Sequence, residues 1–287
     1  VYYISTVCYL QAVKTALFLA EILEPAACQK WKDLQSSIAD GINRVFFDRQ
    51  KLTYGNGVQG ENMLALAEDI VPQAYQQQME QKVRHHYTEE TNYHLYNGIV
   101  LTPVLINYLP DCGFRDVAFR IMTAETYPSY FSLMEGETTF SEHWSKKWPD
   151  YYIGEIGKSE LVKGGGDLSH CHPMYGSVVA WLYERVAGLD LCELYRKTVH
   201  IKPFFMDCLD FAAAKKQTAF GEVSVAWRKE QDRYTMEITI PHGLTAQCCF
   251  PATCRYLQIK GTKQCYYPDE QGYFRFSLDA GQWELTN

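Results

Sequence analysis

The hydrophobic pattern of this 287-residue chain changes period near residue 198, and this change limits the folds that the chain can adopt. Before that point, apolar residues such as Leu10, Val13 and Leu17 recur at three- to four-residue intervals, which is the spacing of one helix face. After it, segment 222–227 alternates apolar and polar residues, as a half-buried strand does. The sequence therefore predicts a helical region followed by a β region.

Residues 1–198 form one helical segment after another, with breaks at proline and glycine such as Pro72, Pro110 and Gly188. The predicted segments cover 9–24, 27–47, 58–70, 73–87, 99–109, 114–124 and 174–187. Helices of similar length joined by alternating short and long connections are typical of a ring of antiparallel helix pairs. A complete twelve-helix ring needs more helices than these, so we predict a mainly α fold with an incomplete (α/α)6 barrel.

Residues 199–287 predict a small antiparallel β-sandwich. The expected strands are 222–227, 234–240, 255–260, 271–278 and 282–286. The polar stretch 229–233 is typical of a hairpin loop, and glycines separate the later strands. We therefore expect two domains, 1–198 and 199–287.

Composition and charge exclude several classes of protein. The chain is 47% hydrophobic and 21% charged, which is ordinary for a globular protein and excludes a disordered one. The net charge is −7 and the basic residues are scattered, so no nucleic-acid partner is expected. The first stretch carries Lys14 and Glu21 and lacks a cleavage site, so we expect neither a signal peptide nor a membrane span. The chain opens inside an apolar pattern, which we interpret as a truncated start.

The ten cysteines form no C-x-x-C pair and no zinc-ligand spacing, and most are expected to be buried thiols. The denser group Cys248, Cys249, Cys254 and Cys265 could hold a disulfide, although adjacent cysteines on a strand point to opposite faces. The cysteines therefore do not indicate whether the protein lies in an oxidising or a reducing compartment.

Segment 136–144, G-E-T-T-F-S-E-H-W, contains the strongest candidate for catalysis. It presents the carboxylate of Glu142 between polar neighbours and the aromatic ring of Trp144. A carboxylate can act as a general base on water, and an indole can face the apolar side of a sugar ring. The same residues also fit a glutamate that caps or salt-bridges a loop.

Glycosidic cleavage needs a second carboxylate. The acids near Glu142 in the sequence are Glu135, Glu137, Asp150, Glu155 and Asp167. The sequence fixes no distance between any of them and Glu142, and a solvated loop charge is the alternative for each.

Segment 164–176 leads from three glycines to His170 and His172 at the start of a predicted helix. Either histidine could bind a sugar hydroxyl or orient Glu142, while capping or packing is the alternative. A His-x-His pair also occurs in metal sites, but no third ligand accompanies it, so we predict no metal and no cofactor. Tyr130, before the Glu142 segment, could line a pocket or pack in the core.

The motifs occur in a recognisable order along the chain: Y-G-N-G-V-Q, H-L-Y-N-G-I, Y-P-S-Y, G-E-T-T-F-S-E-H-W, S-H-C-H-P-M-Y-G and I-K-P. This series resembles the α-L-rhamnosidases of glycoside hydrolase family 78. The resemblance covers nearly the whole chain. It implies the C-terminal portion of an (α/α)6-barrel catalytic domain over 1–198, followed by the family's C-terminal β-sandwich over 199–287.

The resemblance also implies an inverting hydrolase that releases terminal L-rhamnose from glycosides or polysaccharides. Glu142 matches the family's general base and Trp144 the aromatic residue of the same motif. The family's substrate-contacting histidine aligns with His172 or, in another register, with His170. Nothing in this chain matches the acidic motif that carries the general acid, so the chain looks like part of a longer enzyme and is expected to be inactive alone.

Three alternatives stay open. An (α/α)6-barrel glycosidase could act on another sugar, since a fold does not fix a substrate. The chain could instead be a non-catalytic sugar-binding protein or a degenerate fragment. Analogy with the family favours a secreted or periplasmic location, with a cytoplasmic location as the alternative. The sequence does not indicate the oligomeric state.

Overall fold

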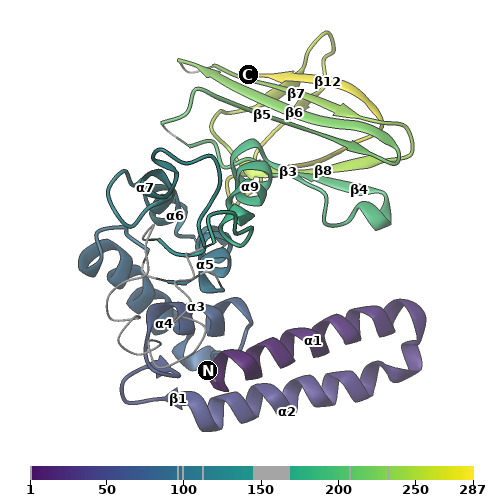
Figure 1. Cartoon of the computed structure of the whole chain (residues 1–287). Helices are drawn as coiled ribbons and strands as arrows, with labels where there is room; N and C mark the ends of the chain where they lie inside the picture. The colour runs from purple at the N-terminus through teal and green to yellow at the C-terminus, as the bar shows by residue number, and fades with distance from the viewer. Residues whose placement is uncertain are drawn as a thin grey trace. The chain divides into compact units, whose positions relative to one another are not determined.

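The protein folds as two compact units, Val1–Gly176 and Ser177–Asn287, in a computed structural model. The structure describes residues 2–95, 97–98, 100–111, 113–144, 169–206, 208–231 and 233–287. Figure 1 shows helices through the first unit and strands through most of the second. The predicted order, helical region first and β region second, is confirmed.

The first unit begins with a helical hairpin of α1 (Tyr2–Leu23) and α2 (Cys28–Phe46), joined by a 3-10 turn at Pro25–Ala27 (Figure 1). The buried residues of α1, including Val7, Leu10 and Val13, lie on one face at helical spacing. By length and composition alone α1 could cross a membrane, a criterion that core helices and signal sequences also meet.

A short β-hairpin, β1 (Phe47–Asp48) and β2 (Thr53–Tyr54), follows α2. Among the residues described before position 145, the elements that follow are α3 (Gln59–Ala67), α4 (Gln73–His85), a π-helical turn (His86–Glu90), α5 (Leu101–Asp111), α6 (Arg115–Met122) and α7 (Tyr130–Met134). The predicted segments between 9 and 124 match α1 to α6. The sequence did not predict α7, which is a short helix with a capping box between Ser129 and Ser132.

The predicted helix 174–187 is three helical pieces of different pitch. They are a 3-10 turn (Tyr175–Ser177), α9 (Val178–Trp181) and a π-helical segment (Leu182–Ala187), which ends at left-handed Gly188. Gly188 has φ +88°, and a Cβ there would lie 2.3 Å from the backbone nitrogen of Pro203. This position therefore requires glycine.

The second unit is a sandwich of a six-stranded and a four-stranded sheet. The larger sheet has the order β10-β9-β12-β7-β6-β5 and the smaller one β11-β8-β4-β3. The strands are β3 (Leu189–Asp190), β4 (Thr198–Ile201), β5 (Phe211–Thr218), β6 (Gly221–Glu230), β7 (Arg233–Ile240), β8 (Thr245–Pro251), β9 (Leu257–Ile259), β10 (Cys265–Tyr266), β11 (Tyr273–Leu278) and β12 (Gly281–Thr286). A 3-10 turn, Leu194–Arg196, lies between β3 and β4. Neighbouring strands pair antiparallel, except that β4 runs parallel to β8.

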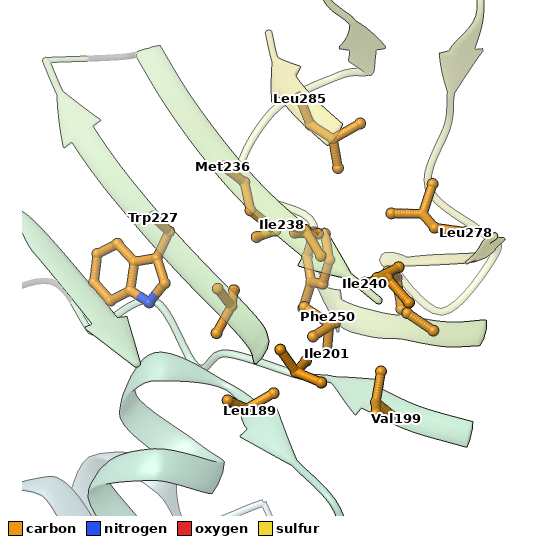
Figure 2. Close-up of a cluster of buried hydrophobic side chains, with 14 of the residues drawn as sticks. Leu189, Val199, Ile201, Trp227, Met236, Ile238, Ile240, Phe250, Leu278 and Leu285 are labelled. Atoms are coloured by element: carbon orange, nitrogen blue, oxygen red, sulfur yellow. The ribbon is translucent and has the colours of Figure 1, made fainter. Parts of the chain in front are cut away.

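Side chains from both sheets form one core, shown in Figure 2. Alternate residues of β6, β7 and β8 point into it, as the period-2 pattern predicts. Trp227 is 2% exposed and its Nε1 donates to the carbonyl of Val186 at 2.9 Å. This buried sheet-on-sheet contact confirms the predicted β-sandwich.

The two compact units part at Gly176/Ser177, which is earlier than the predicted domain boundary at 198/199. The physical reason is that β3 pairs with β4, and that Ala187 and Leu189 belong to the sandwich core. The division into domains 1–198 and 199–287 stays a prediction.

All nine described cysteines are free thiols, including the four of the denser group. The expectation that most would be buried is wrong, because Cys248 is the single buried one among the described cysteines. Cys248 is buried and Cys249 is half-buried, because neighbouring residues of β8 face opposite sides. Burial raises the pKa of the Cys248 thiol.

Candidate active site

Two segments far apart in the sequence lie side by side in the first unit. The amide of Glu142 donates to the carbonyl of Ser169 at 2.9 Å, and the amide of His172 donates to the carbonyl of Phe140 at 2.7 Å. The hydroxyl of Thr139 donates to the carbonyl of His170. These backbone contacts bring Glu142, His170 and His172 into one place.

Among the described residues, the carboxylate of Glu142 is hydrogen-bonded through one of its two oxygens. Its Oε1 accepts a hydrogen bond from the amide of Ser169 at 3.2 Å. No described residue donates to Oε2, and the side chain is half-buried. A carboxylate fixed through one oxygen, with the other open, has the arrangement that a base needs to take a proton from water.

Four aromatic rings pack behind this loop. The ring of Trp144 lies 4.3 Å from that of Tyr175 and meets Tyr130 edge-to-face at 5.3 Å. Phe140 meets Tyr130 edge-to-face at 5.8 Å. Such pairs contribute about 0.5–1.5 kcal/mol each beyond the area that they bury. The cluster therefore fixes the chain on both sides of Glu142.

A hydrogen-bonded chain ties this aromatic cluster to the helices. The indole Nε1 of Trp144 donates to the carbonyl of Asn97 at 2.7 Å. The side-chain amide of Asn97 donates to the hydroxyl of Tyr87 at 2.8 Å. Tyr87 is 1% exposed, and burial raises the pKa of its hydroxyl. Trp144 is thus anchored by its nitrogen as well as by its ring.

The two candidate histidines differ in their surroundings. His170 is exposed, whereas His172 is half-buried and its Nδ1 is buried with no described hydrogen-bond partner. A buried polar atom without a partner costs about 1–3 kcal/mol. A ligand hydroxyl at His172 would remove that cost.

The structure thus brings together all five residues that the sequence singled out: Glu142, Trp144, Tyr130, His170 and His172. Trp144 and Tyr130 are only 5% and 6% exposed, so little of either ring is open to a ligand. Their roles as sugar contacts stay predictions. Among the nearby acids, Glu135 and Glu137 are described, while Asp150, Glu155, Asp167 and the glycine run 164–166 lie outside the described residues.

Sequence reasoning missed Phe140, Tyr175 and Asn97. Each lies inside a motif that was noticed for another residue, so position within a motif was the available signal. Within the described ranges no group of three histidine, cysteine, aspartate or glutamate side chains lies close enough to hold a metal.

Comparison with known proteins identifies the family. Residues 1–186 match the bacterial α-L-rhamnosidase six-hairpin glycosidase domain, and residues 195–264 match the bacterial α-L-rhamnosidase C-terminal domain. The chain belongs to the bacterial α-L-rhamnosidase family. The resemblance expected from the ordered motifs is confirmed, as is the fold, a six-hairpin glycosidase region followed by a β-sandwich.

Individual relatives agree with the family match. An α-L-rhamnosidase of Formosa agariphila is 28% identical over 250 residues, which cover 86% of this chain and 26% of that protein. One from an Alteromonas species is 29% identical over 259 residues, covering 90% of this chain and 26% of that protein. The chain therefore spans about a quarter of the length of the relatives that it matches.

Solved α-L-rhamnosidases have the same fold. The Streptomyces avermitilis enzyme, whose structure is a complex with L-rhamnose, superimposes with a TM-score of 0.84 at 25% identity. The match covers 99% of this chain and 26% of that one. The Dictyoglumus thermophilum enzyme gives the same TM-score and identity, with 97% and 31% covered.

Proposed function

We propose that the protein containing this chain hydrolyses terminal α-L-rhamnose from glycosides or polysaccharides with inversion, and that Glu142 is its general base. Membership of the α-L-rhamnosidase family supports the substrate class. The observation that carries the role of Glu142 is its carboxylate, anchored through Oε1 to Ser169 and open at Oε2 within the described residues.

In an inverting reaction the base removes a proton from water as that water attacks the anomeric carbon. The Oε2 atom of Glu142 accepts this proton, and the bond from Ser169 holds the other oxygen in place. A general acid on the opposite side protonates the leaving oxygen, typically ~6.5–9.5 Å from the base. We propose that this acid comes from residues outside these 287, and that the chain by itself gives no turnover.

We further propose that His172, and not His170, binds a rhamnose hydroxyl. The support is the buried Nδ1 of His172, which has no described partner, set against the exposed position of His170. Trp144 and Tyr130 act mainly by positioning the loop, since both rings are buried against each other and against Tyr175.

The test is hydrolysis of an aryl α-L-rhamnoside by the full-length protein, its Glu142→Gln variant and this chain alone. Removal of a general base is expected to lower kcat by ~10²–10⁴-fold. Glu137→Gln, a change of the same kind in the same loop, is the matched control and should keep most of the activity. Unchanged activity in Glu142→Gln would exclude Glu142 as the base.

The first anomer released by the wild-type protein, followed by NMR, tests inversion. We expect β-L-rhamnose. Initial α-L-rhamnose would contradict the inverting mechanism. Aryl glycosides of other sugars test the substrate class. If one of them is hydrolysed faster than the rhamnoside, that sugar, and not rhamnose, is the substrate.

A further inference from the structure

The outer face of the larger sheet in the second unit carries small, charged and aromatic side chains. Figure 1 shows β5, β6, β7 and β12 side by side in this sheet. Their inward residues, such as Val225, Ile238 and Leu285, form the sandwich core. The residues between them, such as Ala226, Glu237 and Glu284, therefore point outward.

Two open hollows lie on this outer face and share Glu237. One, of about 410 Å³, crosses β5, β6 and β7; the other, of about 420 Å³, crosses β7 and β12. We call the two together the outer furrow, defined by the outward residues Phe211, Ala213, Ala226, Arg228, Thr235, Glu237, Thr239, Gln282 and Glu284. Each hollow has the volume of an ordinary ligand site, ~300–1,000 Å³.

The outer furrow has small side chains at its base and an exposed aromatic ring at one side. Ala213 and Ala226 are paired directly across β5 and β6, so backbone is covered there only by methyl groups. The next outward pair is Phe211 and Arg228, with the guanidinium 5.5 Å from the ring centre. Phe211 is 61% exposed at this place. A flat apolar ring beside a shallow floor offers stacking surface to a ligand ring.

The charges in the furrow also suit a ligand rich in hydroxyls. Glu237 stands directly opposite Glu284 on β12, and like charges in that position destabilise a sheet. Glu284 is paired with Lys260 at 2.6 Å, while no described residue donates to the carboxylate of Glu237. Glu237 is thus an exposed acceptor in the middle of the furrow, with the donor Arg228 and the hydroxyl of Thr235 near it.

We propose that the outer furrow is a second, non-catalytic binding site for a neutral oligosaccharide. The C–H face of one sugar ring stacks on Phe211, and its hydroxyls donate to Glu237 and accept from Arg228. An added peptide strand is excluded at β6, β7 and β12, because both edges of each are already paired. An acidic polymer is disfavoured by Glu237, whose carboxylate has no described cationic partner, whereas Lys260 pairs with Glu284 and Glu230 lies 4.0 Å from Arg228.

The test is affinity electrophoresis of the chain through gels that contain soluble neutral polysaccharides, a rhamnan and an arabinogalactan, with polygalacturonate as the acidic comparison. At least one neutral polymer should retard the chain, and polygalacturonate should not. Phe211→Ala should weaken this binding by about tenfold, whereas Phe211→Tyr should retain it. Ala226→Leu, which fills the floor, should weaken it independently.

Phe220→Ala is the matched control, an exposed phenylalanine at the other end of the β5–β6 hairpin, and it should bind like wild type. His172→Ala, which removes the proposed sugar contact of the active site, separates the two sites and should also leave the retardation unchanged. No retardation by either neutral polymer, or equal retardation of wild type, Phe211→Ala and Ala226→Leu, would overturn the proposal. Loss of retardation in His172→Ala, with retardation kept in Phe211→Ala and Ala226→Leu, would place the polymer at the active-site loop and would also overturn the proposal.

Discussion

The loop that carries Glu142 and the sheet that carries the outer furrow are built on opposite principles. In the loop, residues from 139–144 and 169–175 meet through a few backbone hydrogen bonds and one aromatic cluster. In the sheet, every outward residue is placed by the strand register. The position of a functional residue in the loop therefore depends on each single contact, whereas that of a residue in the sheet depends on the whole core.

The largest effect on stability is expected from Trp227→Ala in the sandwich core. The change removes a 2% exposed indole and its bond to the carbonyl of Val186. Loss of such a side chain costs about 3–5 kcal/mol. Denaturant unfolding followed by circular dichroism measures it, and a loss below about 1 kcal/mol would show that the register does not depend on this core. Phe220→Ala is the exposed control.

Asp190→Asn is expected to have the next largest effect. Burial opposes ionisation of Asp190, but Lys202 at 2.6 Å and the amide of Cys192 outweigh it and hold the pKa of the carboxyl below its usual range. A depressed pKa contributes stability above the unfolded value, near ~3.9, that is lost as pH falls through the folded value. The variant should lose about 3 kcal/mol at pH 7.

Denaturant unfolding at low pH tests whether the ion pair of Asp190 with Lys202 causes this loss. Between wild type and Asp190→Asn, the difference in unfolding free energy should shrink as the pH falls below about 4. A difference that stays constant down to pH 2 would contradict the ion pair with Lys202.

His172→Ala removes a single side chain of the loop, one whose ring nitrogen Nδ1 is buried. If the buried Nδ1 of His172 meets a sugar hydroxyl, its loss should raise KM for an aryl rhamnoside by up to ~10-fold. His170→Ala, in the same segment but exposed, is the control and should change KM little. Equal changes in KM for the two variants would contradict the assignment of the sugar contact to His172 alone.

The smallest effect is expected from Trp144→Phe. This change keeps an aromatic ring against Tyr175 but removes the donor to the carbonyl of Asn97. We expect a loss of about 1 kcal/mol in stability and a several-fold lower kcat, because the loop loses an anchor. Unchanged kcat and stability would mean that packing alone positions Glu142.

The same contrast explains what the sequence could predict. Hydrophobic period in the sequence located α1 to α6 and strands such as β6 and β7. In α1, β6 and β7 the buried residues recur at the spacing that the period predicts. Hydrophobic period did not predict β5, because its sequence F-A-A-A-K-K-Q-T contains residues that favour helices. This segment forms a strand because it pairs with β6. Hydrophobic period also missed β8, where Ala246 and Cys248 are small inward residues that give a weak pattern.

In the candidate site, motifs identified Glu142 and the histidines but not how they meet. The bonds between Glu142 and Ser169 join residues 27 apart in the sequence, and backbone pairing of that kind has no local signature. Nor does periodicity distinguish a buried Trp144 from one that faces a sugar. Side-chain roles of this kind follow from contacts.

Azide rescue of Glu142→Ala in the full-length protein, assayed on an aryl α-L-rhamnoside, tests whether Glu142 is the general base. Azide carries its own charge and needs no base, so it replaces the water that Glu142 would activate. The account predicts a nearly inactive variant whose turnover returns with added azide, giving β-L-rhamnosyl azide. A folded variant that is active without azide, or that azide does not rescue, would contradict the role of Glu142 as general base.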